Sequence, residues 1–232
     1  MDSVKKDNDE IKQLRILTKS KINTSYNKLL KDRGFKRYKS NQYINVTEQH
    51  IIQIVMFEFL SCGFTCAVAM QPLYIQDHTE FTCLHLNFGD RITRFKTVQK
   101  EAWEYHEHEE GIRIIRELLN KNVFPWFEEY GTPKGIVEFI SSGGMKKYGL
   151  FDFNKFFEYQ YLGFSLLYTN QAERGIGYLE RMIDEIRNDS VTSMRDYKFH
   201  IVDLISRIKK SPNNTINALN DIIIRNRLSL NL

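Results

Sequence analysis

The sequence contains little proline, little cysteine and no long apolar run, and each of these features argues against a class of protein. Only 4 of its 232 residues are proline, so long unstructured or proline-rich segments are not expected. No stretch approaches 18 consecutive apolar residues, which argues against a transmembrane helix. Because residues 1–15 are charged and lack the apolar stretch of a secretory signal, we expect a cytoplasmic protein without a membrane anchor.

The three cysteines have no spacing that points to a function. Cys62, Cys66 and Cys83 are an odd number and fit neither a disulfide framework nor a zinc ribbon. We expect reduced thiols in or beside strands, as in a reducing compartment. P-loops, dinucleotide fingerprints and the Gly-x-Ser-x-Gly motif are also absent from the sequence. The sequence therefore predicts no cofactor and no catalytic residue, which favours a binding protein over an enzyme and leaves that question open.

Charge is distributed unevenly along the chain. The sequence has 33 Lys and Arg against 29 Asp and Glu, a net charge of +4. Residues 1–40 hold 12 basic and 5 acidic side chains, a net charge of +7, whereas residues 101–140 hold 4 basic and 9 acidic ones, a net charge of −5. The basic end could attract nucleic acid or an acidic partner. Alternatively, it is the solvated face of a lysine-rich helix.

A helix and its end are predicted near the N-terminus. From Asp9 to Arg33 apolar residues recur at three- and four-residue steps, which indicates one helix, or two if Ser20 or Asn23 interrupts it. Gly34 follows where a left-handed residue often ends a helix, and Phe35 comes where an apolar clasp is common.

Runs with strand character come next. Gln42 to Thr47, His50 to Leu60 and Phe64 to Ile75 are rich in apolar and β-branched residues, and Phe81 to Phe88 alternates. The second run is apolar on both alternating faces, which is typical of a central, covered strand. Trp103 to His106 is a possible short fifth strand. The sequence therefore predicts an antiparallel sheet of four or five strands.

The rest of the chain is predicted to be helical, which gives an α+β fold. Glu109 to Tyr130 has a helical period that Pro125 should kink or split, and Thr132-Pro133 begins another helix. We place a boundary at Ser141 to Gly144. Residues 1–144 form an α+β domain, and residues 145–232 form a helical extension, either separate or packed with the first part. Its expected helices are Phe153 to Tyr168, Gln171 to Arg187, Met194 to Lys209 and Thr215 to Leu228.

Part of the first domain resembles a bacterial domain-of-unknown-function family, number 4304, over residues 11–145. The matching residues are Leu30, Gly34, Phe35, Lys36, Tyr43, Ile51, Gln53, Ile54 and Val55, with Phe124-Pro125-Trp126-Phe127 later. The family has no established activity, so the resemblance implies no catalytic residue. Related small domains occur near bacterial toxin systems, so the resemblance implies an immunity-like or other binding role by association.

The hairpin predicted at residues 153–187 resembles a single tetratricopeptide repeat. The matching residues are Tyr159, Leu162, Gly163, Leu166, Gly175 and Leu179, whereas Met182 stands where the repeat has a small residue. Only one copy is visible, and such repeats usually need three to be stable. An ordinary antiparallel helix pair is the favoured alternative.

One polar cluster raises the possibility of a metal site. His106 and His108 would point to the same side of a strand, as metal ligands do. A third ligand could be Glu110, His85 or His78. A metal-assisted hydrolase using His106 and His108 is therefore one alternative function. An exposed polar loop before a helix is the favoured explanation, because no His-Glu-x-x-His spacing is present.

A second set of candidates is basic. Four basic residues interleave with aromatic ones, a mixture that can contact phosphates and stack on bases; they are Arg33, Lys36, Arg37 and Lys39. Nucleic-acid binding through this segment is an alternative function. The favoured hypothesis is a non-catalytic bacterial binding module that recognises a partner protein, because the resemblance and the helical hairpin both favour one. The partner and the oligomeric state are not predicted by the sequence.

Overall fold

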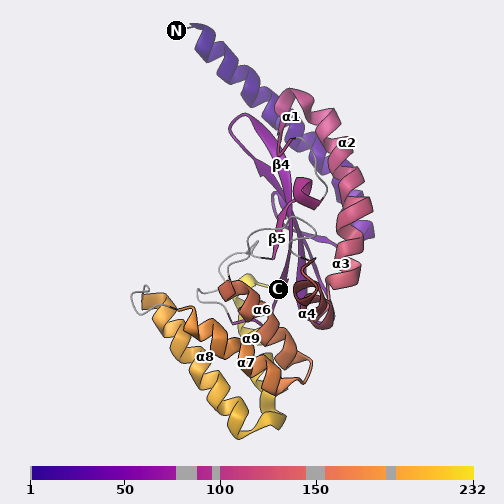
Figure 1. Ribbon diagram of the computed structural model, residues 1–232. Coiled ribbons are helices and arrows are strands. Elements are labelled where there is room, and N and C mark those ends of the chain that lie inside the picture. The colour runs from indigo at the N-terminus through magenta and orange to yellow at the C-terminus, as the bar shows by residue number, and fades with distance from the viewer. Residues whose placement is uncertain (1, 77–87, 96–99, 145–154, 187–191) are drawn as a thin grey trace.

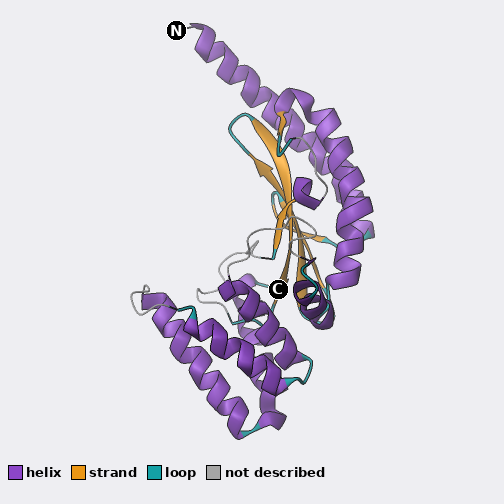
Figure 2. Cartoon of the chain, viewed as in Figure 1, coloured by secondary structure: helices purple, strands orange, loops and turns teal. Residues whose placement is uncertain are grey.

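The computed structural model describes residues 2–76, 88–95, 100–144, 155–186 and 192–232, with side chains from residue 9 onward. An antiparallel sheet with helices packed on it precedes an all-helical part, so the predicted α+β fold is confirmed (Figure 1, Figure 2). The strands are β1 (Lys36–Lys39), β2 (Gln42–Val46), β3 (Ile51–Phe59), β4 (Gly63–Pro72), β5 (Gly89–Arg91) and β6 (Trp103–Glu104).

Helices make up most of the remaining described chain. None of the described helices is both long enough and apolar enough to cross a membrane. The α-helices are α1 (Asp2–Asp32), α2 (His108–Leu118), α3 (Phe124–Tyr130), α4 (Pro133–Ser141), α6 (Lys155–Tyr168), α7 (Ala172–Asp184), α8 (Thr192–Lys210) and α9 (Thr215–Leu230). Short helical turns are η1 (Ile92–Phe95), η2 (Tyr105–Glu107), the π-turn η3 (Leu119–Val123) and η4 (Pro212–Asn214).

All described strand pairs are antiparallel, and the order across the sheet is β1-β2-β3-β4-β5. Further along β4, β6 pairs with Gly63 and Phe64. The predicted meander of β2, β3 and β4 is confirmed. The polar edge strand β1 was not predicted, and residues 81–87 of the predicted fourth run lie outside the described residues.

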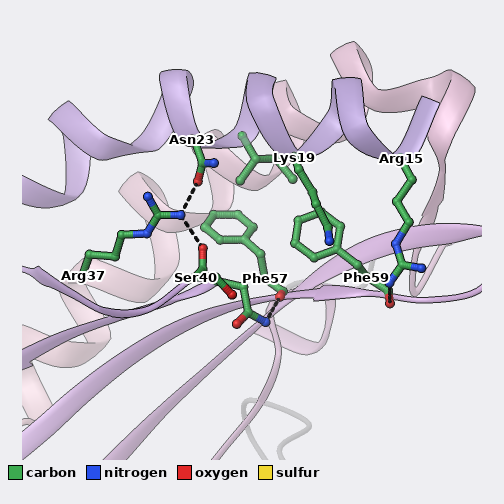
Figure 3. A pocket seen from close by; sticks show the side chains of 9 residues that line it. Arg15, Lys19, Asn23, Arg37, Ser40, Phe57 and Phe59 are labelled. Carbon is green, nitrogen blue, oxygen red and sulfur yellow. Dashed lines mark hydrogen bonds between the residues drawn. The ribbon is translucent and has the colours of Figure 1, made fainter. Parts of the chain in front are cut away.

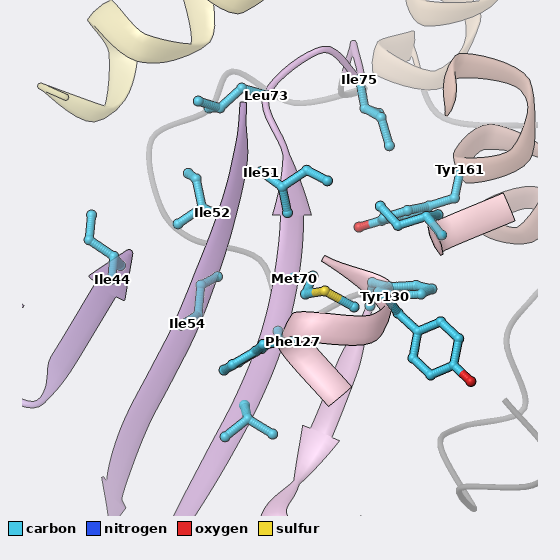
Figure 4. Close-up of a cluster of buried hydrophobic side chains, with 14 of the residues drawn as sticks. Ile44, Ile51, Ile52, Ile54, Met70, Leu73, Ile75, Phe127, Tyr130 and Tyr161 are labelled. Carbon is cyan, nitrogen blue, oxygen red and sulfur yellow. The ribbon is translucent and has the colours of Figure 1, made fainter. Parts of the chain in front are cut away.

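The central strands β3 and β4 are covered on both faces. Ile52, Ile54 and Val55 are fully buried although they alternate between the two sides of the sheet. On one side α1 and α3 provide the cover: the rings of Tyr26 and Phe57 lie 4.8 Å apart, and the Gln53 side chain donates to the carbonyl oxygen of Phe127 at 3.4 Å. Figure 4 shows the buried side chains around these strands. The expectation of a central strand is confirmed.

The end of α1 is set by its glycine. Gly34 has a φ of +83°, and its N–H donates to the Lys31 carbonyl while the Phe35 N–H donates to the Leu30 carbonyl. This pair of bonds is the Schellman motif. Leu30 and Phe35 are both buried, so the cap also turns the chain back toward the core. Helix α1 runs through Ser20 and Asn23 without a break, so it is one helix.

Pro125 splits the helical segment that follows the sheet, as predicted. The π-turn η3 separates α2 from α3, and its last bond runs from the Phe124 N–H to the Leu119 carbonyl. A regular helix would require an N–H from Pro125 and would crowd its ring against the carbonyl of Lys121. Thr132 then caps α4, since its hydroxyl accepts from the Gly135 N–H at 2.9 Å.

Helices α6 and α7 form the predicted antiparallel pair. A Cβ added to Gly163 would lie 2.6 Å from a methyl carbon of Leu179, and one added to Gly175 would lie 2.9 Å from the Gly163 carbonyl oxygen. Both glycines therefore allow the two helices to approach closely. This is the packing that the small-residue positions of the tetratricopeptide-like pattern predict, within a single helix pair.

The helical part contacts the sheet through polar groups as well as apolar ones. The amide of Asn226 on α9 donates to the carbonyls of Leu73 (2.7 Å) and Ile75 (3.0 Å). At the β2–β3 turn, His50 has a φ of +60°, and its Nδ1 lies 3.4 Å from the Arg227 guanidinium. The two bonds from Asn226 satisfy buried backbone carbonyls, so they fix α9 against the end of β4.

The cap at Gly34 generates a prediction about stability. Gly34→Ala should lower the free energy of unfolding by about 1–2 kcal/mol, because a residue with a Cβ is disfavoured in the left-handed region. The added methyl group would cause no steric clash, since the nearest atom, the Oδ1 of Asn45, would lie 3.5 Å away. Gly177→Ala is the control. Gly177 lies within α7, and a Cβ added there would have no atom within 4 Å, so this variant should raise the free energy of unfolding by up to about 1 kcal/mol. Urea unfolding of both variants measures this, and equal effects would contradict it.

A second prediction concerns pH and His50. Burial lowers the pKa of His50, and the neighbouring charge of Arg227 lowers it further. Unfolded protein therefore takes up this proton more readily, so stability should fall as the pH drops below the ordinary histidine range of about 6.5. His50→Asn removes the titration and tolerates a positive φ. Urea unfolding at about pH 7.5 and about pH 5 should show a smaller loss in the variant, and an equal loss would refute the assignment.

Candidate functional site

The proposed metal ligands do not lie on a strand. Strand β6 ends at Glu104, so His106 is in the turn η2 and His108 begins α2. Two residues apart in a helical turn, the side chains point in different directions, so the expected same-side arrangement is wrong. The Nδ1 of His106 lies 3.4 Å from a carboxylate oxygen of Glu104, and that of His108 lies 3.0 Å from the Tyr105 carbonyl.

No third ligand joins them among the described residues. Glu110 is exposed on the first turn of α2. His78 and His85 lie outside the described residues. Within the described part of the chain, no group of three or more His, Cys, Asp or Glu side chains could hold a metal ion.

The cysteines also lie apart. Cys62 is exposed in the turn between β3 and β4, and Cys66 is buried in β4. Burial raises the pKa of the Cys66 thiol, and the negative charge of Glu58 adds to that shift. A thiol in this state is a poor nucleophile. Cys83 lies outside the described residues.

The four basic candidates do not form one site. Arg33 pairs with Glu128 at 3.2 Å and lies 4.7 Å above the Phe124 ring, so it ties α1 to α3. Lys36 and Lys39 are exposed on β1. Strand alternation puts Lys36 on the opposite face of the strand from Arg37. Of the four, Arg37 lines the pocket described next, and the other three do not.

That pocket lies between α1, the β1–β2 turn and the end of β3 (Figure 3), and its volume is about 310 Å³. Its lining contains three cations, three polar side chains and three apolar ones, and no carboxylate; the residues are Arg15, Lys19, Ile22, Asn23, Arg37, Ser40, Asn41, Phe57 and Phe59. We call it the basic pocket. Small-molecule sites commonly have volumes of about 300–1,000 Å³, so it is large enough for a compact ligand.

Neutral groups hold the cations of the basic pocket. Arg15 donates to the carbonyl of Phe59 at 3.2 Å, and its Nε is buried without a partner among the described residues. Arg37 donates to the Asn23 side chain at 3.1 Å and to the Ser40 carbonyl. Lys19 places its Nζ 5.0 Å from the ring centroid of Phe59.

The positive charge in the basic pocket is therefore not neutralised locally. None of its three cations forms an ion pair with a carboxylate in the described part of the chain. The charge of Arg37 also acts on the core: burial raises the pKa of Tyr43, and Arg37 opposes this shift. An anion would find unpaired cations and free N–H donors here, which is the arrangement that phosphate groups require.

Sequence reasoning found Arg37 and missed the other two cations. Arg15, Lys19 and Asn23 recur every four residues, so they lie along one side of α1. That spacing is visible in the sequence and indicates that the three side chains share one side of the helix. What it could not show is that β1 and the end of β3 lie opposite this side of the helix.

A second hollow lies between α7 and α8, with a volume of about 580 Å³. Its lining combines apolar residues, Ile183, Val202 and Ile205, with charged ones. Lys209 and Glu180 form an ion pair of 2.7 Å across it. We call it the α7–α8 groove. One turn before Val202, Phe199 is 74% exposed, so the apolar surface continues along α8.

No protein-family model, curated protein or solved structure matches this chain. The resemblance to the domain-of-unknown-function family therefore stays a prediction.

Proposed function

We propose that this protein is a binding module whose basic pocket holds a phosphate group of an anionic ligand. The observation that carries the proposal is the cluster of three cations that line one pocket with no carboxylate. Arg15 is partly buried, and Lys19 and Arg37 are exposed. Like charges gathered in one pocket repel each other, and a bound counter-charge relieves that repulsion. Arg15, Lys19 and Arg37 are held by carbonyl and amide oxygens and by an aromatic ring, so their charge is available to a ligand.

The aromatic wall favours single-stranded nucleic acid as that ligand. Phe59 is partly buried at the rim of the pocket, beside Lys19. Proteins that bind single strands combine a basic groove with aromatic side chains on which bases stack. This function corresponds to the nucleic-acid alternative, in which Arg37 is kept and Arg15 and Lys19 take the place of Arg33, Lys36 and Lys39.

Recognition of a partner protein is the second candidate function. It is favoured by the apolar residues that line the α7–α8 groove and by the exposure of Phe199 beside it. Exposed apolar patches with a polar rim commonly mark protein-interaction sites. A groove between antiparallel helices suits an amphipathic helix of a partner. An immunity-like role, implied by the family resemblance, would use such a surface.

The basic pocket can be tested with a fluorescein-labelled single-stranded oligonucleotide at low salt. Lys19→Gln should weaken binding by about tenfold to a hundredfold, because a charge-assisted hydrogen bond contributes about 1.5–3 kcal/mol and about 1.4 kcal/mol is a factor of ten. It should also reduce the slope of log K against log salt by about 0.7, the value for one lost phosphate contact. Since Lys19 has no ion pair among the described residues, the variant should remain as stable as wild type in urea unfolding.

Lys28→Gln is the matched control for this test. Lys28 lies on the same helix, pairs with Asp32 at 2.7 Å and does not line the pocket. It should leave both affinity and salt slope nearly unchanged. Equal losses in the two variants would mean diffuse electrostatic attraction, and no binding by wild type at low salt would refute the nucleic-acid ligand. Inorganic phosphate should compete with the oligonucleotide if the pocket binds the phosphate group, and this competition measures the phosphate contact separately from base stacking.

The α7–α8 groove can be tested by affinity capture from a lysate of the native host, with and without nuclease. Val202→Glu should abolish the nuclease-resistant captured proteins, because Val202 is 48% exposed in the free protein and a bound partner would bury the new charge against apolar side chains. Leu228→Glu is the control, since Leu228 is 72% exposed on α9 and does not line the groove. Loss of every captured protein on nuclease treatment would contradict this second function.

A further inference from the structure

The N-terminal part of α1 extends beyond the sheet (Figure 1), and it carries the exposed apolar residues Ile11 and Leu17. Residues 9–13 are all exposed. Ile11 and Leu17 are 39% and 42% exposed, and Leu14 between them is partly buried. Spaced three residues apart, these side chains occupy an arc of roughly 120° on the helix. We call Ile11, Leu14 and Leu17 the α1 stripe.

Charges of opposite sign flank the α1 stripe at its two ends. Glu10 lies at the N-terminal end and Lys21 at the C-terminal end, and both are exposed. By helix geometry each lies within roughly 40° of Leu14 around the helix axis. A surface with an acidic end, an apolar middle and a basic end is complementary to itself when it is turned around.

We propose that two copies of this chain associate through their α1 stripes, with the helices antiparallel. A pairing that sets Leu14 opposite Leu17 of the second copy also sets Glu10 opposite Lys21, since both pairs are centred on the same point of the helix. Two-fold symmetry repeats each contact, so the interface is self-complementary. A parallel pairing would instead oppose Glu10 to Glu10 and Lys21 to Lys21, which repels.

The dimer leaves the basic pocket open, so this inference does not depend on the proposed function. Arg15, Lys19 and Asn23 lie roughly 100–180° around α1 from Leu14. The helix therefore uses different sides for the pocket and for the second copy.

Sedimentation velocity over a range of protein concentrations tests the pairing. Wild type should self-associate reversibly, and Glu10→Lys or Lys21→Glu should each weaken association roughly tenfold, because two attractive contacts become repulsive. The double variant, with both changes in one chain, should restore the wild-type affinity. In a parallel pairing the single changes would leave the number of like-charge contacts unchanged, so unaltered association of both would overturn the antiparallel arrangement.

Leu17→Gln and Ile16→Gln form a matched pair for the apolar contact. Both residues are exposed, by 42% and 56%, but Ile16 lies roughly 200° around the helix from Leu14. Leu17→Gln should prevent association, and Ile16→Gln should not, while both keep the wild-type circular dichroism spectrum. A monomeric wild type at every concentration, or equal losses in the two variants, would overturn the proposal.

Discussion

The structure depends on one constraint: β3 and β4 are apolar on both faces and must be covered on both. Ile52 and Ile54 point to one side of the sheet and Val55 and Phe57 to the other, yet all four are fully buried. At about 25 cal/mol per Å² of apolar surface removed from water, such strands cannot remain at a surface. Helices α1, α2 and α3 therefore lie across one face, and the cap at Gly34 sends the chain from α1 directly into the sheet that α1 covers.

The same constraint also ties the helical part to the sheet through hydrogen bonds. Leu73 and Ile75 follow β4 and are buried, but their backbone carbonyls no longer have strand partners. Asn226 of α9 supplies the two hydrogen bonds, and Gln160 of α6 and Tyr197 of α8 both donate to the carbonyl of Gln76 just beyond. Buried carbonyls left without donors would cost about 1–3 kcal/mol each, so these polar side chains fix where the helices meet the sheet.

Much of the fold could be predicted because its signals are local. Gly34 with Phe35, Pro125 and Thr132-Pro133 each mark an element end through backbone chemistry, and the structure places an end at each. Strand β1 was missed because Lys-Arg-Tyr-Lys is an exposed edge, where pairing with β2 rather than burial makes the strand. His106 was misplaced because two residues of β6 give too short a pattern to separate a strand from a helical turn.

The basic pocket shows why sites are harder to predict than elements. The four-residue spacing of Arg15, Lys19 and Asn23 is visible in the sequence, but 33 residues lie between Asn23 and Phe57 along the chain, including the end of α1 and strands β1 and β2, and only the fold brings them together. Several surface cations elsewhere are paired, such as Arg33 with Glu128 and Lys209 with Glu180. Ion pairs of this kind bring distant elements together and screen each other's charge. In the pocket, neutral oxygens hold Arg15 and Arg37, and the ring of Phe59 lies beside Lys19, so no carboxylate screens these charges and they can act on a ligand.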